Sequence, residues 1–404
     1  MMHPNRMTDL MAEGIFLKLH EIKDQLIKEG REVINLSVGS PDLPPAPHIM
    51  DKLIEECKTA SNYRYAITDL SELRDAASRW YKRRFNVELD ANCEITSLLG
   101  SQEGLAHICL ALTDEEDIVM VHNPGYPIYH AGPQIAQNVI YPMPTRKGSA
   151  LIDFDSIPSD VAEKAKLMIV SYPNNPTAQV ADNDFYKELV KFAKANDIMV
   201  VHDNAYCELT YDDYKAGSFL QIEGARDVGI ELNSLSKTYN LAGIRVGFAL
   251  GNRDMIKCIA TIKSHMDYGI FVPIQKCAIA ALDGDQSCIE ETRSAYQRRR
   301  DILCDGLNSI GWQVEKPKAT MFVWAKLPNA FSNSDDFVMK LAKDTGVIVT
   351  PGSAFGKMGE GYVRMALVAS EEKMMRVVEN LRKSDLFITK HWIIRLKMDL
   401  FIEK

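Results

Sequence analysis

The sequence predicts an α/β fold: a larger part built on a mostly parallel β-sheet flanked by helices, and a smaller α+β lobe. Apolar runs such as KLMIV and IMVV are continuous, which indicates strands buried on both faces of a sheet. These strands alternate with segments of helical periodicity, the pattern of parallel sheets joined by helices. From about Ile289 onward, long charged helical segments accompany only a few strands, which indicates the second lobe.

The N-terminal part is predicted to contain a helix from about Ala12 to Glu29, because apolar residues recur there with helical spacing. That apolar stripe consists of Ile15, Leu19, Ile22 and Leu26. A short strand, VINLSVG, follows and ends in a turn at Gly39. The N-terminal segment is expected to join the smaller lobe.

Strands and helices then alternate along the middle of the chain. CEITSLL precedes the helical SQEGLAHICLAL, EDIVMVHN precedes a Pro-Gly turn, and KLMIVSYPNNP precedes the helical DNDFYKELVKFAKAND. IMVVHDNAY, VGIELNSLSK and IRVGFAL are three further predicted strands, and MFVWAKL, GVIVT and GYVRMALV are the strands of the smaller lobe. The C-terminal FITKHWIIRLKMDLFIEK fits an amphipathic helix.

A length of 404 residues favours two lobes over one. We expect a large domain over residues 45–288. The small domain is expected to combine residues 1–44 with residues 289–404.

Composition excludes several classes of protein. A net charge of −8 argues against a general nucleic-acid binder, which would present a basic face. No apolar run approaches the roughly 20 residues of a membrane span, and no signal sequence opens the chain. The eight cysteines are scattered without a Cys-x-x-Cys pair, so we expect reduced thiols and no metal site. Cytoplasmic location is the resulting expectation.

Ser234-Leu-Ser236-Lys237, followed by Arg245, is the first chemical signal. A lysine becomes nucleophilic when burial and nearby cations favour its neutral form, and hydroxyls with a guanidinium can hold a phosphate. A solvated surface lysine is the simplest alternative. The Ser-x-x-Lys motif of serine acyl-enzymes is another, but the Ser-Asp-Asn and Lys-Thr-Gly motifs that accompany it are absent.

Asp203 ends the apolar strand IMVVHD, and Tyr206 follows three residues later. The carboxyl ends of such strands are where α/β folds bind ligands. Because burial raises an aspartate pKa, an ionised Asp203 needs a cationic partner, such as a protonated pyridine nitrogen. A helix N-cap is an equally good explanation of Asp203 taken alone.

Two further motifs follow predicted strands. Ser101 and Gln102 open a helix directly after Gly100, where backbone N–H groups form an anion site, although serine is also an ordinary N-cap. Asn175 lies in the rigid loop SYPNNPT at the same predicted edge of the sheet, although a purely structural turn would look alike.

The order of these motifs resembles the class I/II aminotransferases, which are fold-type I enzymes dependent on pyridoxal phosphate. The series is Gly-Ser-Gln, Asn-Pro-Gly-Tyr-Pro, Pro-Asn-Asn-Pro, Asp-x-x-Tyr, Ser-x-Ser-Lys with Gly-x-Arg-x-Gly, and Tyr-Val-Arg-Met. The resemblance runs from about Leu36 to Leu381. Within the family, the motifs are most similar to those of the aspartate, alanine and LL-diaminopimelate aminotransferases. It implies a mostly parallel seven-stranded sheet in the large domain.

The resemblance also implies roles for individual residues. Lys237 would form the Schiff base with the cofactor and, once freed, move the substrate proton. Asp203 would keep the pyridine nitrogen protonated, and Tyr206 with Asn175 would bond the phenolic oxygen. Tyr126 would stack on the ring. The phosphate would be held by Ser101, Gln102, Ser234, Ser236 and Arg245.

Arg364 resembles the arginine that clamps the substrate α-carboxylate, with Gly39 and Asn175 beside the substrate. A tyrosine that reaches the phosphate of a neighbouring subunit is expected near Tyr65, with Tyr63 as the alternative. Asp69 stands where the family has glycine, which leaves this register open. A shared site implies a homodimer.

The carboxylate clamp alone implies only an amino-acid substrate, and this fold hosts several reactions. Because the motifs most resemble those of aminotransferases, transamination between an L-amino acid and a 2-oxo acid is the expected reaction. A carbon–sulfur β-lyase is the alternative enzyme. A regulatory ligand-binding module is the alternative outside enzymes, but only about 35 residues precede the first motif, too few for a winged-helix domain.

Overall fold

The computed structural model describes residues 14–387. The start of the predicted N-terminal helix and nearly all of the predicted C-terminal helix lie outside the described residues. The chain forms two compact units: residues 40–295 with 318–321, and the described residues 14–39, 296–317 and 322–387. The predicted domain limits at residues 45 and 289 stay a prediction.

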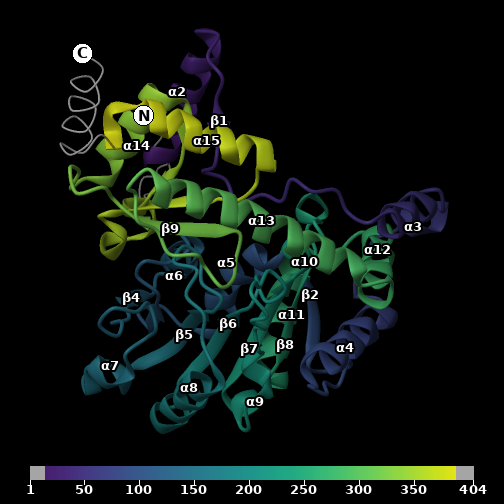
Figure 1. The fold of residues 1–404 in the computed structure, drawn as a ribbon. Coiled ribbons are helices and arrows are strands. Elements are labelled where there is room, and N and C mark those ends of the chain that lie inside the picture. The colour runs from purple at the N-terminus through teal and green to yellow at the C-terminus, as the bar shows by residue number, and fades with distance from the viewer. Residues whose placement is uncertain (1–13, 388–404) are drawn as a thin grey trace, which may run out of the picture. The chain divides into compact units, whose positions relative to one another are not determined.

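The first unit is built on a seven-stranded sheet, ordered β2-β8-β7-β6-β5-β3-β4 (Figure 1). Only β8 runs antiparallel to its neighbours, so the predicted mostly parallel seven-stranded sheet is confirmed. Its strands are β2 (Ile95–Leu98), β3 (Ile118–Val121), β4 (Val139–Pro142), β5 (Ala165–Ser171), β6 (Met199–Asp203), β7 (Gly229–Ser234) and β8 (Gly247–Gly251).

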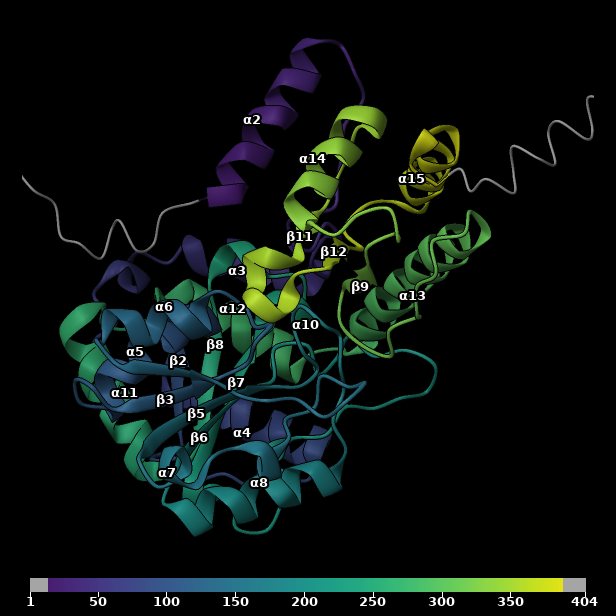
Figure 2. The ribbon, with the colours of Figure 1, turned by 90° about the vertical axis from the view of Figure 1, so that its left-hand side faces the viewer.

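Helices cover both faces of this sheet, as Figure 2 shows edge-on. The longer helices are α3 (Pro47–Cys57), α4 (Ser71–Phe85), α5 (Ser101–Leu112), α6 (Ile128–Ile135), α8 (Asn183–Asn196), α11 (Arg253–Met266) and α12 (Val272–Asp283). Short helices are α7 (Ser159–Ala162), α9 (Ala225–Val228) and α10 (Leu235–Thr238), and α13 (Ser287–Ser309) leads into the second unit.

Two apolar cores sandwich the sheet because side chains alternate along each strand. Val201 of β6 packs in the core that includes α5, α6 and α11, whereas Val200 packs with α4 and α8. By the same alternation His202 belongs to the α4–α8 face and Asp203 to the α5–α6 face. The continuous apolar runs in the sequence therefore reflect strands buried on both sides.

The second unit combines both ends of the described chain. Strand β1 (Ile34–Asn35) pairs in parallel with β10 (Val347–Ile348), and a separate antiparallel sheet has the order β11-β12-β9. The latter strands are β9 (Phe322–Lys326), β11 (Thr350–Pro351) and β12 (Tyr362–Ala366), and the helices are α2 (Gly14–Lys28), α14 (Ser334–Thr345) and α15 (Glu371–Lys383). The predicted run GVIVT is thus two strands in two sheets.

Candidate active site

The carboxyl edge of the large sheet brings the predicted motifs together. Ser171 of β5 lies beside Asp203 of β6, and Asp203 lies beside Leu232, two residues before the end of β7. At that end Ser234 is opposite Gly247 of β8, which in turn is opposite Leu98 of β2. The parallel strands β2, β5, β6 and β7 therefore end at this edge, each followed by a candidate motif, and the antiparallel β8 begins there directly after Arg245 and Val246.

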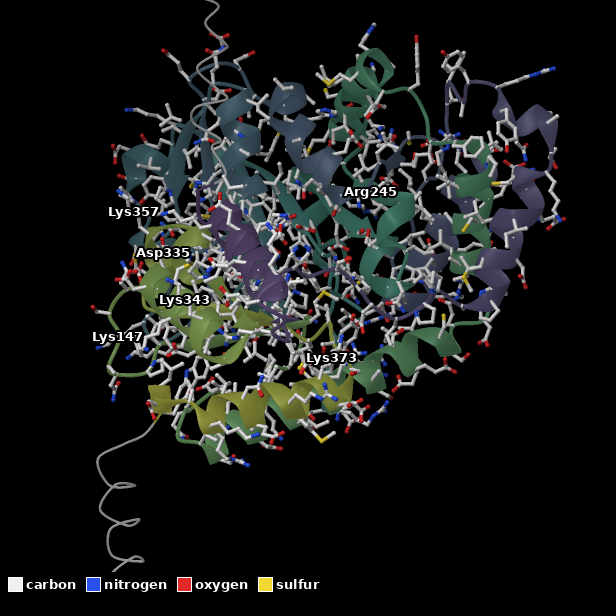
Figure 3. The ribbon with its side chains drawn as sticks, turned by 90° about the horizontal axis from the view of Figure 1, so that it is seen from above. Lys147, Arg245, Asp335, Lys343, Lys357 and Lys373 are labelled. Carbon is white, nitrogen blue, oxygen red and sulfur yellow. The ribbon has the colours of Figure 1, made fainter. Side chains whose placement is uncertain are left out.

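The N-terminus of α5 forms a cradle for an anion. Gly100 takes a left-handed φ of 78° and is the N-cap, so Ser101 is the first helical residue and not the N-cap. Arg245, an exposed residue marked in Figure 3, bends back over this turn. Its Nη2 donates to the Leu99 carbonyl at 3.3 Å and its Nη1 to the Ala242 carbonyl at 3.0 Å. A guanidinium and free helix N–H groups at one point suit a phosphate.

Two glycines make this close approach possible. A Cβ on Gly100 would lie 2.4 Å from Nη2 of Arg245. A Cβ on Gly247 would lie 2.7 Å from the Asn233 carbonyl oxygen and 3.1 Å from the backbone nitrogen of Ser101. The cradle therefore depends on the absence of side chains at these two positions, because a Cβ at either would occupy its space.

Lys237 lies in the short helix α10, in the connection between β7 and β8 that also carries Arg245. The buried Ser234 is the N-cap of α10, because its side chain accepts a hydrogen bond from the backbone N–H of Ser236 at 3.2 Å. Lys237 itself is partly buried. One hairpin connection thus supplies a constrained lysine, two hydroxyls and the guanidinium.

Asp203 is 5% exposed, and its surroundings favour a ligand role over a helix cap. No helix follows it among the described residues up to Ser218; instead its Oδ1 accepts from the Ala205 N–H at 3.3 Å. Burial raises the pKa of Asp203, while the hydrogen bond from Tyr129 and the charge of His202 oppose that rise. The helix N-cap interpretation is therefore wrong.

Side-chain contacts join further predicted residues in pairs. The Tyr126 hydroxyl donates to Oε1 of Gln102 at 2.6 Å, which links the Pro-Gly-Tyr-Pro turn to the start of α5. Asn175 and Tyr206 are both buried, and Nδ2 of Asn175 donates to the Tyr206 hydroxyl at 3.4 Å. These pairs place an aromatic ring, an amide and a phenol at the same sheet edge.

Arg364 belongs to the second unit, in the middle strand β12. It is 5% exposed, and its guanidinium lies 4.2 Å from the ring centre of Phe322 and 4.6 Å from that of Phe355. Its Nη2 donates to the Ser37 carbonyl at 2.7 Å, two residues before the partly buried Gly39. A guanidinium oriented between two rings is suited to bidentate binding of a carboxylate.

The region around Tyr65 differs from the other predicted sites because it is open. Tyr65 is 86% exposed, and its ring centre lies 5.9 Å from that of Tyr268. Tyr63 instead donates its hydroxyl to the Cys57 carbonyl at 2.8 Å. Asp69, which replaces the expected glycine, accepts hydrogen bonds from the backbone and hydroxyl of Ser97 in β2.

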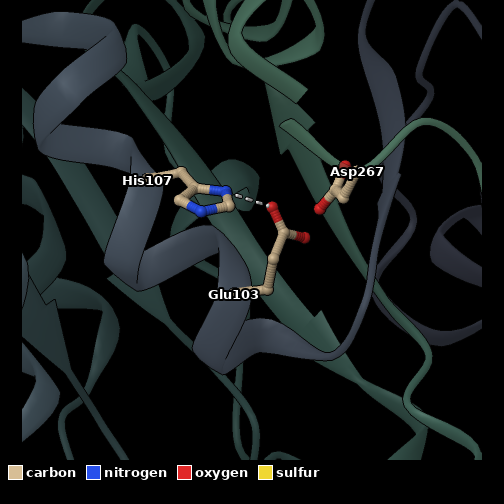
Figure 4. Close-up of side chains that lie close together, drawn as sticks. All are labelled: Glu103, His107 and Asp267. Atoms are coloured by element: carbon tan, nitrogen blue, oxygen red, sulfur yellow. Dashed lines mark hydrogen bonds and ion pairs between the residues drawn. The ribbon is translucent and has the colours of Figure 1, made fainter. Parts of the chain in front are cut away.

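Glu103, His107 and Asp267 form an acidic cluster that has the composition of a metal site (Figure 4). The ammonium group of the buried Lys263 already lies within it, 3.2 Å from Glu103 and 3.0 Å from Asp267. Glu103 also accepts the N–H of Leu99 at 2.9 Å. Lys263 thus offsets the charge of one of the two carboxylates, and Glu103 anchors the backbone that leads into the anion cradle.

Sequence reasoning did not identify Tyr129, whose hydroxyl donates to Oδ2 of Asp203 at 2.8 Å. It stands three residues after Tyr126, a spacing that places two residues on one side of a helical turn. That spacing was the available signal. The close approach of Gly247 to Ser101, in contrast, depends on strand pairing, which its local motif does not reveal.

No helix within residues 14–387 is long and apolar enough to cross a membrane. The combination of this sheet with this site defines the fold-type I transferases that depend on pyridoxal phosphate.

Comparison with known proteins narrows the class. The family model for aminotransferase class I and II matches residues 31–381. The LL-diaminopimelate aminotransferase of Moorella thermoacetica is 46% identical over 371 residues, covering 91% of this chain and 95% of that one. The glutamate-pyruvate aminotransferase AlaC of Escherichia coli is 40% identical over 381 residues, covering 93% and 92%.

Solved structures agree with this result. Substrate-bound BacF from Bacillus subtilis superposes with a TM-score of 0.91 at 37% identity, covering 95% of this chain and 98% of that one. The chain belongs to the class I and II aminotransferases. It is therefore an enzyme that depends on pyridoxal phosphate and transfers amino groups between amino acids and 2-oxo acids.

Proposed function

We propose that Lys237 holds pyridoxal phosphate as a Schiff base and that the residues around it perform transamination. The observation that carries this assignment is the cradle at the start of α5, where Arg245 lies over Gly100 in space that a Cβ would fill. It fits a phosphate, to which Ser101, Gln102, Ser234 and Ser236 add further donors. The cradle accounts for the phosphate group of the cofactor. The residues proposed to hold its ring lie at the ends of the neighbouring strands.

The residues for the ring follow from the order of strands. Asp203, buried at the end of β6, is suited to a protonated pyridine nitrogen, since a cation offsets the cost of burying its charge. Tyr206 and Asn175, already in contact, would donate to the phenolic oxygen, and Tyr126 would cover one face of the ring.

When bound, pyridoxal phosphate withdraws electrons from the substrate α-carbon through its protonated ring. Lys237, displaced by the incoming amino acid, would carry the proton between that α-carbon and C4′ of the cofactor. Arg364 would bind the substrate α-carboxylate with both arms of its guanidinium, together with Asn175 and the backbone at Gly39. Those contacts fix which bond at the α-carbon is broken.

A diamino dicarboxylic acid of the LL-diaminopimelate kind is the donor we propose, since the relative with 46% identity carries that name. The relative with 40% identity is named for glutamate and pyruvate, which makes these the competing pair. Incubating the loaded enzyme with each amino acid in turn, with 2-oxoglutarate or pyruvate as acceptor, separates the two. Faster turnover of alanine or glutamate than of LL-diaminopimelate would reject the proposed donor.

Lys237→Ala tests the assignment of the lysine. We expect the variant to lose turnover and the visible absorbance band of the Schiff base, because no amine remains to form it. A variant that retains the band would contradict the role of Lys237. In the wild-type enzyme, release of pyruvate and ammonia from cystathionine or cysteine, without reversal of the spectrum by a 2-oxo acid, would favour the β-lyase.

A homodimer is proposed from the exposed apolar surface around Tyr65. Tyr63, Ile67 and Tyr268 are each more than half exposed, and Ile54 of α3 adds to them. Burying such a surface against a second copy stabilises the assembly, and the free position of Tyr65 suits contact with the partner's phosphate. Tyr63 is the weaker choice because its hydroxyl is bonded to its own Cys57.

We propose that the enzyme works in the cytoplasm. All eight cysteines are free thiols, and four of them are buried. Reduced cysteines are usual where the glutathione pool keeps thiols reduced. Fractionation of the source cells would test this, and recovery of the activity outside the cytoplasm would contradict it.

A further inference from the structure

Tyr129 occupies a fixed position on the Asp203 face of the sheet. It is the second residue of α6, and its side chain is 1% exposed within the core that α5, α6 and α11 form on this face. Helix α6 packs closely on α5, because a Cβ on Gly132 would lie 2.5 Å from the Leu105 carbonyl oxygen. The ring therefore has little freedom to move away from Asp203.

The contact between the two residues has a defined direction. The Tyr129 hydroxyl lies 2.8 Å from Oδ2 of Asp203. Burial, and then the charge of Asp203, raise the pKa of Tyr129 well above its ordinary value, so the phenol keeps its proton and donates. Ala205 donates to Oδ1, and since an ionised carboxylate has about four acceptor positions, room remains for another donor.

Tyr129 also contacts the proposed ring-covering residue. Its ring meets that of Tyr126 edge to face, with centres 6.0 Å apart and planes at 82°. One buried side chain thus touches both the carboxylate assigned to the ring nitrogen and the aromatic assigned to the ring face. Packing alone would explain the aromatic contact, but it does not require a hydroxyl aimed at a carboxylate.

We propose that Tyr129 is a positioning residue for transamination: its hydroxyl keeps the Asp203 carboxylate ionised and oriented toward the ring nitrogen of pyridoxal phosphate. The inference rests on the proposed role of Asp203. A donor on Oδ2 makes the carboxylate a weaker base, so the shared proton stays on the ring nitrogen. Loss of the hydroxyl reduces the positive charge of the ring and slows the chemical step more than it weakens substrate binding.

Tyr129→Phe tests this, because it removes the hydroxyl and keeps the buried ring. The matched control is Tyr211→Phe, a residue that is 1% exposed and donates to the Thr320 carbonyl at 2.6 Å. Cofactor-free protein is titrated with pyridoxal phosphate and with its 1-deaza analogue, in which C–H replaces the ring nitrogen. Quenching of protein fluorescence reports both affinities.

Tyr129→Phe should bind pyridoxal phosphate about tenfold more weakly, as expected for a lost hydrogen bond to a charged group, with little change for the 1-deaza analogue. In the loaded enzyme kcat should fall with KM nearly constant. The control should match wild type in all three measurements. Equal weakening of both compounds by Tyr129→Phe would overturn the inference, because it would show a packing role.

Asp203→Asn separates this inference from the function on which it rests. That variant should lose the preference for pyridoxal phosphate over the 1-deaza analogue. If it keeps the preference, the proposed role of Asp203 fails. If Asp203→Asn loses the preference while Tyr129→Phe keeps it, only the inference about Tyr129 is overturned.

Discussion

Arg364 shows how the fold fixes the orientation of a single buried side chain. Two aromatic rings and the Ser37 carbonyl hold its guanidinium inside the second unit. The sequence run YVRMALV could predict that Arg364 is not part of a surface ion pair, because the arginine lies within an apolar strand. The aromatic partners could not be predicted, since Phe322 lies in β9 and Phe355 in a separate turn.

Arg364→Lys should raise KM for amino acids about 10- to 100-fold, because lysine keeps the charge but cannot form two parallel hydrogen bonds. Arg364→Ala should have a larger effect in the same direction. Affinity for pyridoxal phosphate should stay at the wild-type value. Steady-state kinetics and cofactor titration measure the two quantities, and loss of the cofactor instead would assign Arg364 to the phosphate or to the fold.

Gly100→Ala should weaken binding of pyridoxal phosphate by about tenfold or more, because its Cβ would displace the Arg245 guanidinium and force alanine into a left-handed φ. Gly148→Ala is the matched control. Gly148 has a φ of 75° but open space around its Cβ position, so only backbone strain of about 1 kcal/mol is expected. Equal cofactor affinity in the two variants would argue against the cradle.

Among the secondary-structure elements, those with strong periodicity were predictable and those defined by pairing were not. The apolar strands β5 and β6 and the helices α5 and α8 were recognised from sequence. The edge strand β4 was missed, since its exposed and half-buried residues lack the alternation of a strand with one buried face. Its existence depends on parallel pairing with β3.

Helices α3 and α12 are linked by a buried carboxylate, Glu56. Its Oε1 lies 2.8 Å from Nζ of Lys52, and its Oε2 lies 2.7 Å from Nζ of Lys276. Hydrogen bonds from Lys276 and then Lys52 lower the pKa of Glu56 to about 2. Because the folded-state pKa lies below the unfolded one, the contribution to stability is complete above the unfolded pKa and is lost as the pH falls toward about 2.

Glu56→Gln should therefore lower the free energy of unfolding by about 1–2 kcal/mol at pH 7, with the difference shrinking below pH ~4. Glu55→Gln is the control: Glu55 also contacts Lys52 but its side chain is 69% exposed, so little change is expected. Urea denaturation of cofactor-free protein, at pH 7 and below pH ~4, measures the free energy of unfolding of each variant and of wild type. A deficit in Glu56→Gln that does not depend on pH would exclude the ion pair as its cause.

On the scale of the whole molecule, sequence predicted two lobes because residue composition changes along the chain. It could not predict how the exposed surface around Tyr65 is composed, since Tyr65 and Tyr268 are distant in sequence and meet only in the folded unit. Asp69 illustrates the same limit. It departs from the family pattern, and the compensating bonds to Ser97 emerge only from the fold.

Tyr65→Phe should weaken binding of pyridoxal phosphate if the hydroxyl reaches the partner's site, whereas Tyr63→Phe should not. Mixing subunits of Tyr65→Phe with subunits of Lys237→Ala should restore tight binding and turnover, since the mixed dimer contains one site with both residues intact. Sedimentation should show a dimer throughout. A monomer with full activity would exclude a shared site.

The pairing of β1 with β10 also determines the order in which the chain can acquire its structure during synthesis. Thr350 donates its hydroxyl to the Ser37 carbonyl across 313 residues, and Ile34 pairs with Val347. At roughly 5–20 residues per second, a ribosome needs about 15 to 60 seconds to add the intervening chain. All seven strands of the large sheet have been synthesised before then, since β8 ends at Gly251. Strand β1 is thus translated long before the strand with which it pairs.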